Sequence, residues 1–171
     1  MKFLKLMFAC TILAASCSED KENDHTSLSS ADIYFSQHAT YSNLAEIIEG
    51  GIAVANGDMD SVKIFGQMMV TDHSDAQAEL DAIASQLQLE LPSTPDSAHQ
   101  AMATQLQALS GYVFDTTYIG FQIRDHQNAI ADFNYQLAEG NNQQLVNYAH
   151  KYLPVIQMHL QEALDIQEML H

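Results

Sequence analysis

The chain has 171 residues, of which 47% are hydrophobic, and its formal net charge is −16, from 6 Lys and Arg against 22 Asp and Glu with histidine counted as neutral. The length and apolar content suit one domain with a core of its own. The negative charge repels polyanions, so nucleic acid is excluded as an expected partner.

Residues 1–16 have the three parts of a secretory signal peptide. Lys2 and Lys5 precede an apolar run from Leu6 to Ala14, and small residues follow it up to Cys17. The run of about nine residues is too short for a membrane-spanning helix, which needs about 20. We therefore expect residues 1–16 to be removed and the protein to be exported.

Cys17 is expected to be the lipidated first residue of the mature protein. The string LAASC, residues 13–17, resembles a bacterial lipobox, although Ala14 stands where leucine is common. Ordinary cleavage after Ser16 is the alternative, and it would leave a free thiol. Cys10 lies within the signal peptide, so Cys17 has no disulfide partner in the mature chain, and an odd exposed cysteine favours lipidation.

Residues 17–30 are polar and charged, which predicts a disordered tether after the lipidated cysteine. Ser18 resembles the outer-membrane sorting residue of lipoproteins, and the acidic residues at 19–24 resemble a surface-export signal of Bacteroidota lipoproteins. A solvated spacer is the alternative.

We expect an outer-membrane lipoprotein that faces the periplasm or the cell surface. Its expected partner is the membrane, which it contacts through its lipid. A protein partner cannot be named from the sequence.

Residues 31–171 show helical punctuation and no strand-like alternation. Ser29 and Asp32 form a capping box, Pro92 ends one helix, and EGNN at 139–142 separates two others. The expected long helices are 33–55, 60–89, 112–138 and 142–170, with a short extra helix at 97–108. Short connections between helices of similar length predict an all-α, antiparallel up-down four-helix bundle.

Three of the long helices carry one histidine within the apolar stripe that recurs every three or four residues. These histidines are His73, His126 and His159. The first helix is expected to face the core with Tyr41, Ala45, Ile48 and Ile52, with Glu46 beside that line. Glu46 and the three histidines lie about 11 to 18 residues from turns at the same end of the bundle, so at 1.5 Å per residue they share a height within about 10 Å.

Two interpretations of these histidines compete. They are either neutral core residues hydrogen-bonded to their neighbours, or ligands of a single transition-metal ion together with Glu46. A full di-iron site is not expected, because none of these three histidines has a glutamate three residues before it, as the ExxH spacing requires. Non-covalent haem between His73 and His126 is a weaker hypothesis. No nucleophile–base pair is present, so a non-catalytic role is expected.

Several segments resemble the bacterial domain-of-unknown-function 4142 family over about residues 33–168. They are NLAEIIEGGIA, VKIFGQMMVTDHS, LSGYVFDTTYI, RDHQNAI and LPVIQMHLQEA. The resemblance implies a secreted or lipid-anchored protein with a ferritin-like four-helix fold, and it aligns Glu46, His73, Asp115, Tyr118, His126 and His159 with family motifs. It implies hardly any activity, because fold does not fix function.

The expected function is therefore a binding or structural role in the cell envelope. The alternative is a metal-binding redox or storage protein that uses the core histidines. Iron, manganese and zinc are the candidate ions for that alternative.

Overall fold

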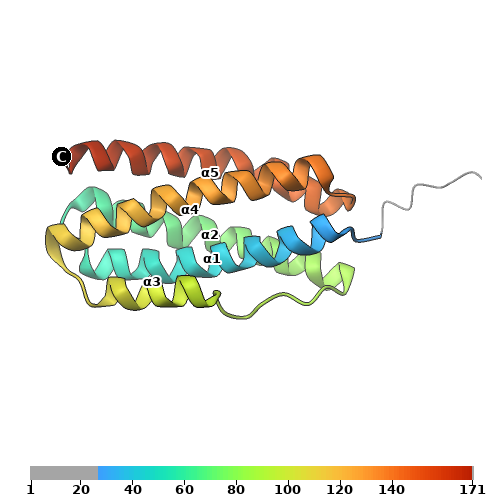
Figure 1. The fold of residues 1–171 in the computed structure, drawn as a ribbon, viewed down its shortest axis with the longest axis horizontal. Helices are drawn as coiled ribbons and strands as arrows, with labels where there is room; N and C mark the ends of the chain where they lie inside the picture. The colour runs from blue at the N-terminus through green and yellow to red at the C-terminus, as the bar shows by residue number, and fades with distance from the viewer. Residues whose placement is uncertain (1–26, 171) are drawn as a thin grey trace, which may run out of the picture.

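The computed structural model describes residues 27–170 (Figure 1). Five helices and no strand occur in this part of the chain, which confirms the all-α class. They are α1 (Ser30–Asn56), α2 (Asp60–Leu87), α3 (Ser97–Gln107), α4 (Gly111–Glu139) and α5 (Gln143–Met169). The predicted signal peptide, Cys17 and the tether up to residue 26 lie outside the described residues.

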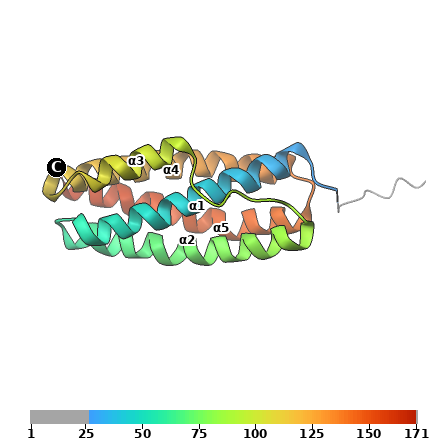
Figure 2. The same cartoon turned by 90° about the horizontal axis from the view of Figure 1, so that it is seen from below.

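The four long helices lie side by side, and α3 runs along one flank of the bundle (Figures 1 and 2). The chain reverses direction on both sides of α3, so α2 and α4 run in the same direction (Figure 1), which differs from the simple up-down order expected from the sequence. The turns at 57–59 and 140–142 therefore lie at opposite ends of the bundle and not at the same end, as Asp115 and Asp32 show below. α3 packs chiefly against α1. Within residues 27–170 no helix combines the length and the apolar character that crossing a membrane requires.

Two apolar clusters fill the interior, one toward each end of the bundle. The first contains Ala53, Val62, Phe65, Met69, Leu106, Phe114, Tyr118, Ile119, Ala163, Ile166 and Leu170. The second contains Phe35, Ala39, Ala76, Leu80, Phe133, Leu145, Tyr148, Ala149, Tyr152 and Ile156. Each long helix carries buried polar residues between its members of the two clusters: Asn43, Glu46, His73, Gln122, His126 and His159. A polar layer therefore separates two apolar cores.

The inward face of α1 differs from the predicted one. Ile48 is 42% exposed, whereas Glu46 and Glu49 are buried. The physical reason is a close approach of two backbones, since a Cβ built on Gly50 would lie 2.6 Å from the carbonyl oxygen of Gly66 on α2. This glycine contact turns α1 so that small and polar residues, rather than its largest aliphatic ones, meet the core.

Two buried aspartates fix the turns at the ends of the bundle. The carboxylate of Asp115, near the start of α4, accepts hydrogen bonds from the backbone N–H groups of residues 58–59, between α1 and α2. Asp32, in the first turn of α1, accepts from the N–H groups of residues 141–142, between α4 and α5, and from the side chain of Gln136. Asp32 also completes the predicted capping box with Ser29. Each pair of helices thus holds the turn of the other pair.

Candidate metal centre

Three histidines from three helices meet in the polar layer. His73 of α2, His126 of α4 and His159 of α5 are 4%, 2% and 1% exposed. Their ring centroids are 5.4 to 5.8 Å apart. One ligand-capable nitrogen of each ring lies within 4.8 Å of the other two. The structure therefore brings together the three histidines that the sequence predicted to face the core, because each lies near the middle of its helix.

The outward nitrogens of His73 and His126 each contact a hydrogen-bond acceptor. His73 Nδ1 lies 3.0 Å from the side-chain oxygen of Asn43, whose amide nitrogen donates to the hydroxyl of Tyr148. His126 Nδ1 lies 2.9 Å from the carbonyl oxygen of Gln122, one turn earlier in α4. Because both partners are acceptors, both Nδ1 atoms carry the proton, which leaves the lone pair on Nε2.

His159 carries its proton on the other ring nitrogen, Nε2, but its outward nitrogen likewise contacts an acceptor. Its Nε2 donates to the carboxylate of Asp72 at 2.9 Å, so the lone pair lies on Nδ1. Asp72 is one residue before His73, and its side chain is 33% exposed. A carboxylate that orients an imidazole and raises its basicity is the usual partner of a metal-ligating histidine.

The three inward nitrogens have no hydrogen-bond partner among the described residues. They are Nε2 of His73, Nε2 of His126 and Nδ1 of His159, and all three are buried. Leaving buried acceptors unpaired costs about 1–3 kcal/mol each. Three such lone pairs facing one another require a donor or a cation between them.

Protonation of one ring would supply a donor between the three nitrogens, but the pKa values of the rings disfavour it. Burial, and then repulsion from His159, lowers the pKa of His126 to about 3. Burial and the charges of the other two rings lower the pKa of His73 well below its usual value. Burial also lowers the pKa of His159, although its bond to Asp72 acts in the other direction. All three rings are therefore neutral at pH 7, which is the form that binds metal ions.

The space at the three rings is large enough for a water molecule or a metal ion. A cavity of about 10 Å³ is lined by Asp72, His73 and His159, among other residues, but not by His126. It is about large enough for one water and lies to the side of the space that the three nitrogens share. A water donates two hydrogen bonds and would leave one of the three nitrogens unpaired. A metal ion accepts all three lone pairs, after the rings close to the roughly 3.4 Å nitrogen separations that Zn–N bonds of about 2.0–2.1 Å require. The His73 and His126 ring centroids are 5.8 Å apart, and the His159 ring lies 5.4 Å from each of them, so a porphyrin does not fit between the two rings and the haem hypothesis has no support in this geometry.

Glu46, the fourth expected ligand, lies behind His126 and outside this group. One carboxylate oxygen is 3.8 Å from His126 Nδ1, and the other accepts a 2.6 Å hydrogen bond from the side chain of Gln122. Burial, and then the charge of Glu49, raises the pKa of Glu46 well above its usual value. Glu46 therefore lies near the outward nitrogen of His126 and does not face the space between the three inward nitrogens.

Sequence reasoning missed the residues that orient the rings. Asn43 follows buried Ala39 by four positions on α1, and Gln122 precedes His126 by four positions on α4. The same spacing that revealed the histidines would have placed both polar side chains in the core. Asp125, the residue before His126, is 9% exposed and pairs with Arg124.

Fold and site together define a helical-bundle protein with a buried three-histidine centre. The family described as "Domain of unknown function (DUF4142)" matches residues 17–166, and the chain belongs to this family, which confirms the resemblance noted in its sequence. A search of curated proteins gave no match. The chain is similar to the crystal structure of a DUF305 fragment from Deinococcus radiodurans, with a TM-score of 0.74 and 11% identity over 83% of this chain and 98% of that one. At this identity the likeness concerns the fold alone.

Proposed function

We propose that this protein binds a single transition-metal ion through His73, His126 and His159. The observation that carries the proposal is the set of three buried, unpaired ring nitrogens within 4.8 Å, each on a ring whose other nitrogen contacts an acceptor. Of the two functions expected from the sequence, metal binding is the one that this geometry supports. Neutral imidazoles favour zinc, copper, iron or nickel over magnesium or calcium.

The proposed role is to hold the ion rather than to catalyse a reaction with it. Catalytic zinc sites keep a position open for substrate, whereas the cavity that reaches His73 and His159 measures about 10 Å³. The three histidines themselves are at most 4% exposed, so no organic substrate reaches an ion held between them. The role is therefore storage or carriage of metal.

We infer that the bundle has a ferritin-like arrangement, in which the antiparallel hairpins α1–α2 and α4–α5 are joined through α3, and that the protein is anchored in the outer membrane by lipid on Cys17. The reversal within each hairpin, the shared direction of α2 and α4 (Figure 1) and the likeness at a TM-score of 0.74 support the first inference. The signal-peptide pattern of residues 1–16, and a family match that begins at residue 17, support the second.

Anchoring is tested by labelling expressing cells with an alkyne-tagged palmitate and following the protein into the membrane fraction. The full-length chain should carry the label, and Cys17→Ser should carry none and leave the membrane. An unlabelled wild-type protein with a free N-terminal cysteine would show ordinary signal cleavage instead.

Metal binding is tested by loading chelator-stripped protein with zinc, cobalt, copper, iron or manganese and measuring bound metal by mass spectrometry. We expect one ion per chain for at least one of these metals. His73→Ala and His126→Ala should each abolish it. Cobalt offers a second signal, because its absorption spectrum reports the ligand geometry.

His150→Ala is the matched control. His150 lies on α5, the same helix as His159, but its side chain is exposed, whereas that of His159 is buried. This variant should keep the full metal content. Metal saturation at 100 times Kd should stabilise the wild-type protein by about 2.7 kcal/mol and the centre variants by nothing. Metal-free wild-type protein, or equal binding by the His73→Ala and His150→Ala variants, would refute the proposal.

A further inference from the structure

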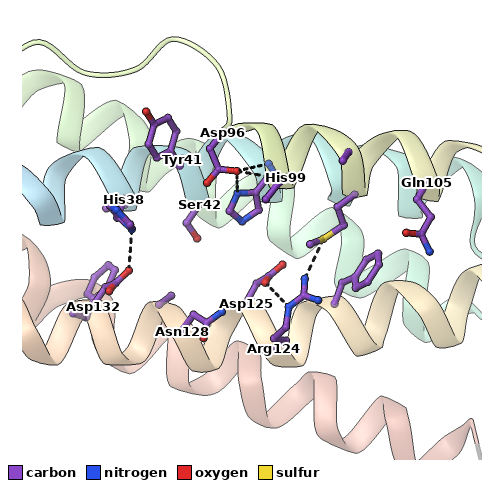
Figure 3. Close-up of a pocket in the computed structure, with 17 residues that line it drawn as sticks. His38, Tyr41, Ser42, Asp96, His99, Gln105, Arg124, Asp125, Asn128 and Asp132 are labelled. Atoms are coloured by element: carbon purple, nitrogen blue, oxygen red, sulfur yellow. Dashed lines mark hydrogen bonds and ion pairs between the residues drawn. The ribbon is translucent and has the colours of Figure 1, made fainter.

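A pocket of about 550 Å³ lies between α1, α3 and α4 (Figure 3). Small-molecule sites typically measure about 300–1,000 Å³, so the pocket is large enough for an organic ligand. None of the three centre histidines lines it. The pocket is therefore a separate feature from the metal centre.

Small side chains on three helices create this space. The walls include Ala39 and Ser42 of α1, Ala98 and Ala101 of α3, and Ala129 of α4. Because α3 packs chiefly against α1, the gap toward α4 stays open. The pocket is built from helix backbones and is preformed.

Negative charge dominates the polar part of its lining. Three carboxylates face one guanidinium, with histidine counted as neutral: Asp96, Asp125 and Asp132 against Arg124. Figure 3 shows Asp96, which caps the start of α3, across the space from Asp125 on α4. The net charge of −16 has the same sign. The resulting potential concentrates cations at the pocket.

One of these carboxylates has an unpaired oxygen. Asp125 is 9% exposed, and its Oδ1 lies 3.2 Å from Arg124 Nε, whereas Oδ2 has no partner among the described residues. The rest of the Arg124 guanidinium is turned away, since its terminal nitrogen contacts the sulfur of Met102 and its carbon lies 5.0 Å from the Phe121 ring centroid. The Asp125 side chain points from α4 into the space beneath α3 (Figure 3).

We propose that the pocket binds a small organic cation, a protonated amine on an apolar body, whose ammonium group donates to Asp125. Met102, Phe121 and Phe133 supply the apolar lining, and an ammonium group brings the donors that the free oxygen requires. A bare metal ion fits less well. The only three-residue ligand set within 4.8 Å in residues 27–170 is the histidine centre itself.

Tryptamine, tryptophol and indole-3-acetate test the proposal, because they share an indole body and end in an ammonium, a hydroxyl and a carboxylate. The chain contains no tryptophan, so indole fluorescence anisotropy reports the probe alone. With chelator-stripped protein at pH 7, tryptamine should bind at least tenfold more tightly than tryptophol. Indole-3-acetate should show no saturable binding.

Asp125→Asn should weaken tryptamine binding at least tenfold and change tryptophol binding less than twofold. Asp165→Asn, on exposed α5 surface, is the matched control and should change neither. Ala129→Leu fills the pocket and should weaken both probes together. The zinc content of each variant is measured in parallel, since Asp125 adjoins His126, and a loss of tryptamine binding with zinc binding intact separates the two sites.

Equal affinity for tryptamine and tryptophol would overturn the proposal. So would equal tryptamine binding by the Asp125→Asn and Asp165→Asn variants. Displacement of tryptamine by zinc added beyond the amount held at the histidine centre would also overturn it, in favour of a second metal ion.

Discussion

Glu49→Gln should make the protein more stable at neutral pH, by an amount that grows with pH. Glu49 is 1% exposed, and neither carboxylate oxygen has a partner in the described part of the chain. Burial and then the charge of Asp125 raise its pKa to about 8, while Arg124 acts in the opposite direction. The folded protein therefore keeps a proton that the unfolded chain loses above its ordinary pKa of 4.5.

The sign and size follow from proton linkage. A group with a raised folded-state pKa contributes stability that is fully present below pH 4.5 and is lost as the pH rises toward about 8. pH 7 lies 2.5 pH units above the unfolded-state pKa of 4.5. At 1.36 kcal/mol per unit, the unfolding free energy has therefore fallen by about 3 kcal/mol at pH 7. Glutamine does not ionise, so the variant escapes this loss.

The assay is urea unfolding followed by circular dichroism, on chelator-stripped protein at pH 5, 6, 7 and 8. The difference in unfolding free energy between the Glu49→Gln variant and wild type should increase by about 2–3 kcal/mol between pH 5 and pH 7. Glu168→Gln, the same substitution at an exposed position on α5, should give a difference that is flat with pH. A flat or shrinking difference for Glu49→Gln would refute the reasoning, because it would mean that this buried acid is already ionised.

Three further outcomes are expected. Asp72→Asn removes the carboxylate that orients His159 and should weaken metal binding about 10–100-fold in competition with a chromophoric chelator; unchanged affinity would contradict the role of Asp72. Asp32→Ala should cost about 3 kcal/mol at pH 7 by urea unfolding. Burial raises the pKa of Asp32, but hydrogen bonds led by that from Gln136 outweigh it, so the net pKa is lowered. The stability that Asp32 supplies is present above its ordinary pKa of 3.8 and is lost below it, so the cost should shrink in acid. Gly50→Ala, whose Cβ would meet a backbone oxygen at 2.6 Å, should destabilise by about 1–3 kcal/mol, whereas Gly51→Ala, with nothing within 4 Å, should stabilise by about 0.5–1 kcal/mol; calorimetry that ranks the two variants equally would contradict the close contact of α1 and α2.

The inward direction of the three histidines was predictable because helix geometry is strict, and the 3.6-residue period places His73, His126 and His159 in apolar stripes. Their common height was expected from two turns at one end of the bundle, but these turns lie at opposite ends. The histidines still meet because each lies near the middle of its helix, and the predicted helix ends lie within three residues of the observed ones. No knowledge of side-chain contacts was needed.

The rotation of α1 was not predictable from its apolar residues. Its stripe of Tyr41, Ala45, Ile48 and Ile52 suggested one face, whereas a backbone contact at Gly50 determines another. Glycine has no apolar side chain, so a search for apolar stripes does not detect a backbone contact at Gly50. The positions of Glu46 and Glu49 follow from this rotation, and the open flank beside α3 depends on helix separations that the one-dimensional pattern does not contain.

The exchange of turn contacts between Asp32 and Asp115 has a consequence for how the protein opens. The N–H groups at 58–59 depend on an acid of α4, and those at 141–142 depend on an acid of α1. Amides in such end turns ordinarily exchange with solvent by local fraying. Here neither pair can be released unless the two helical hairpins part, so these four amides should exchange at the rate of global unfolding. Neither hairpin, cut from the other, would retain an ordered turn, and the bundle should fold as one cooperative unit rather than as two halves.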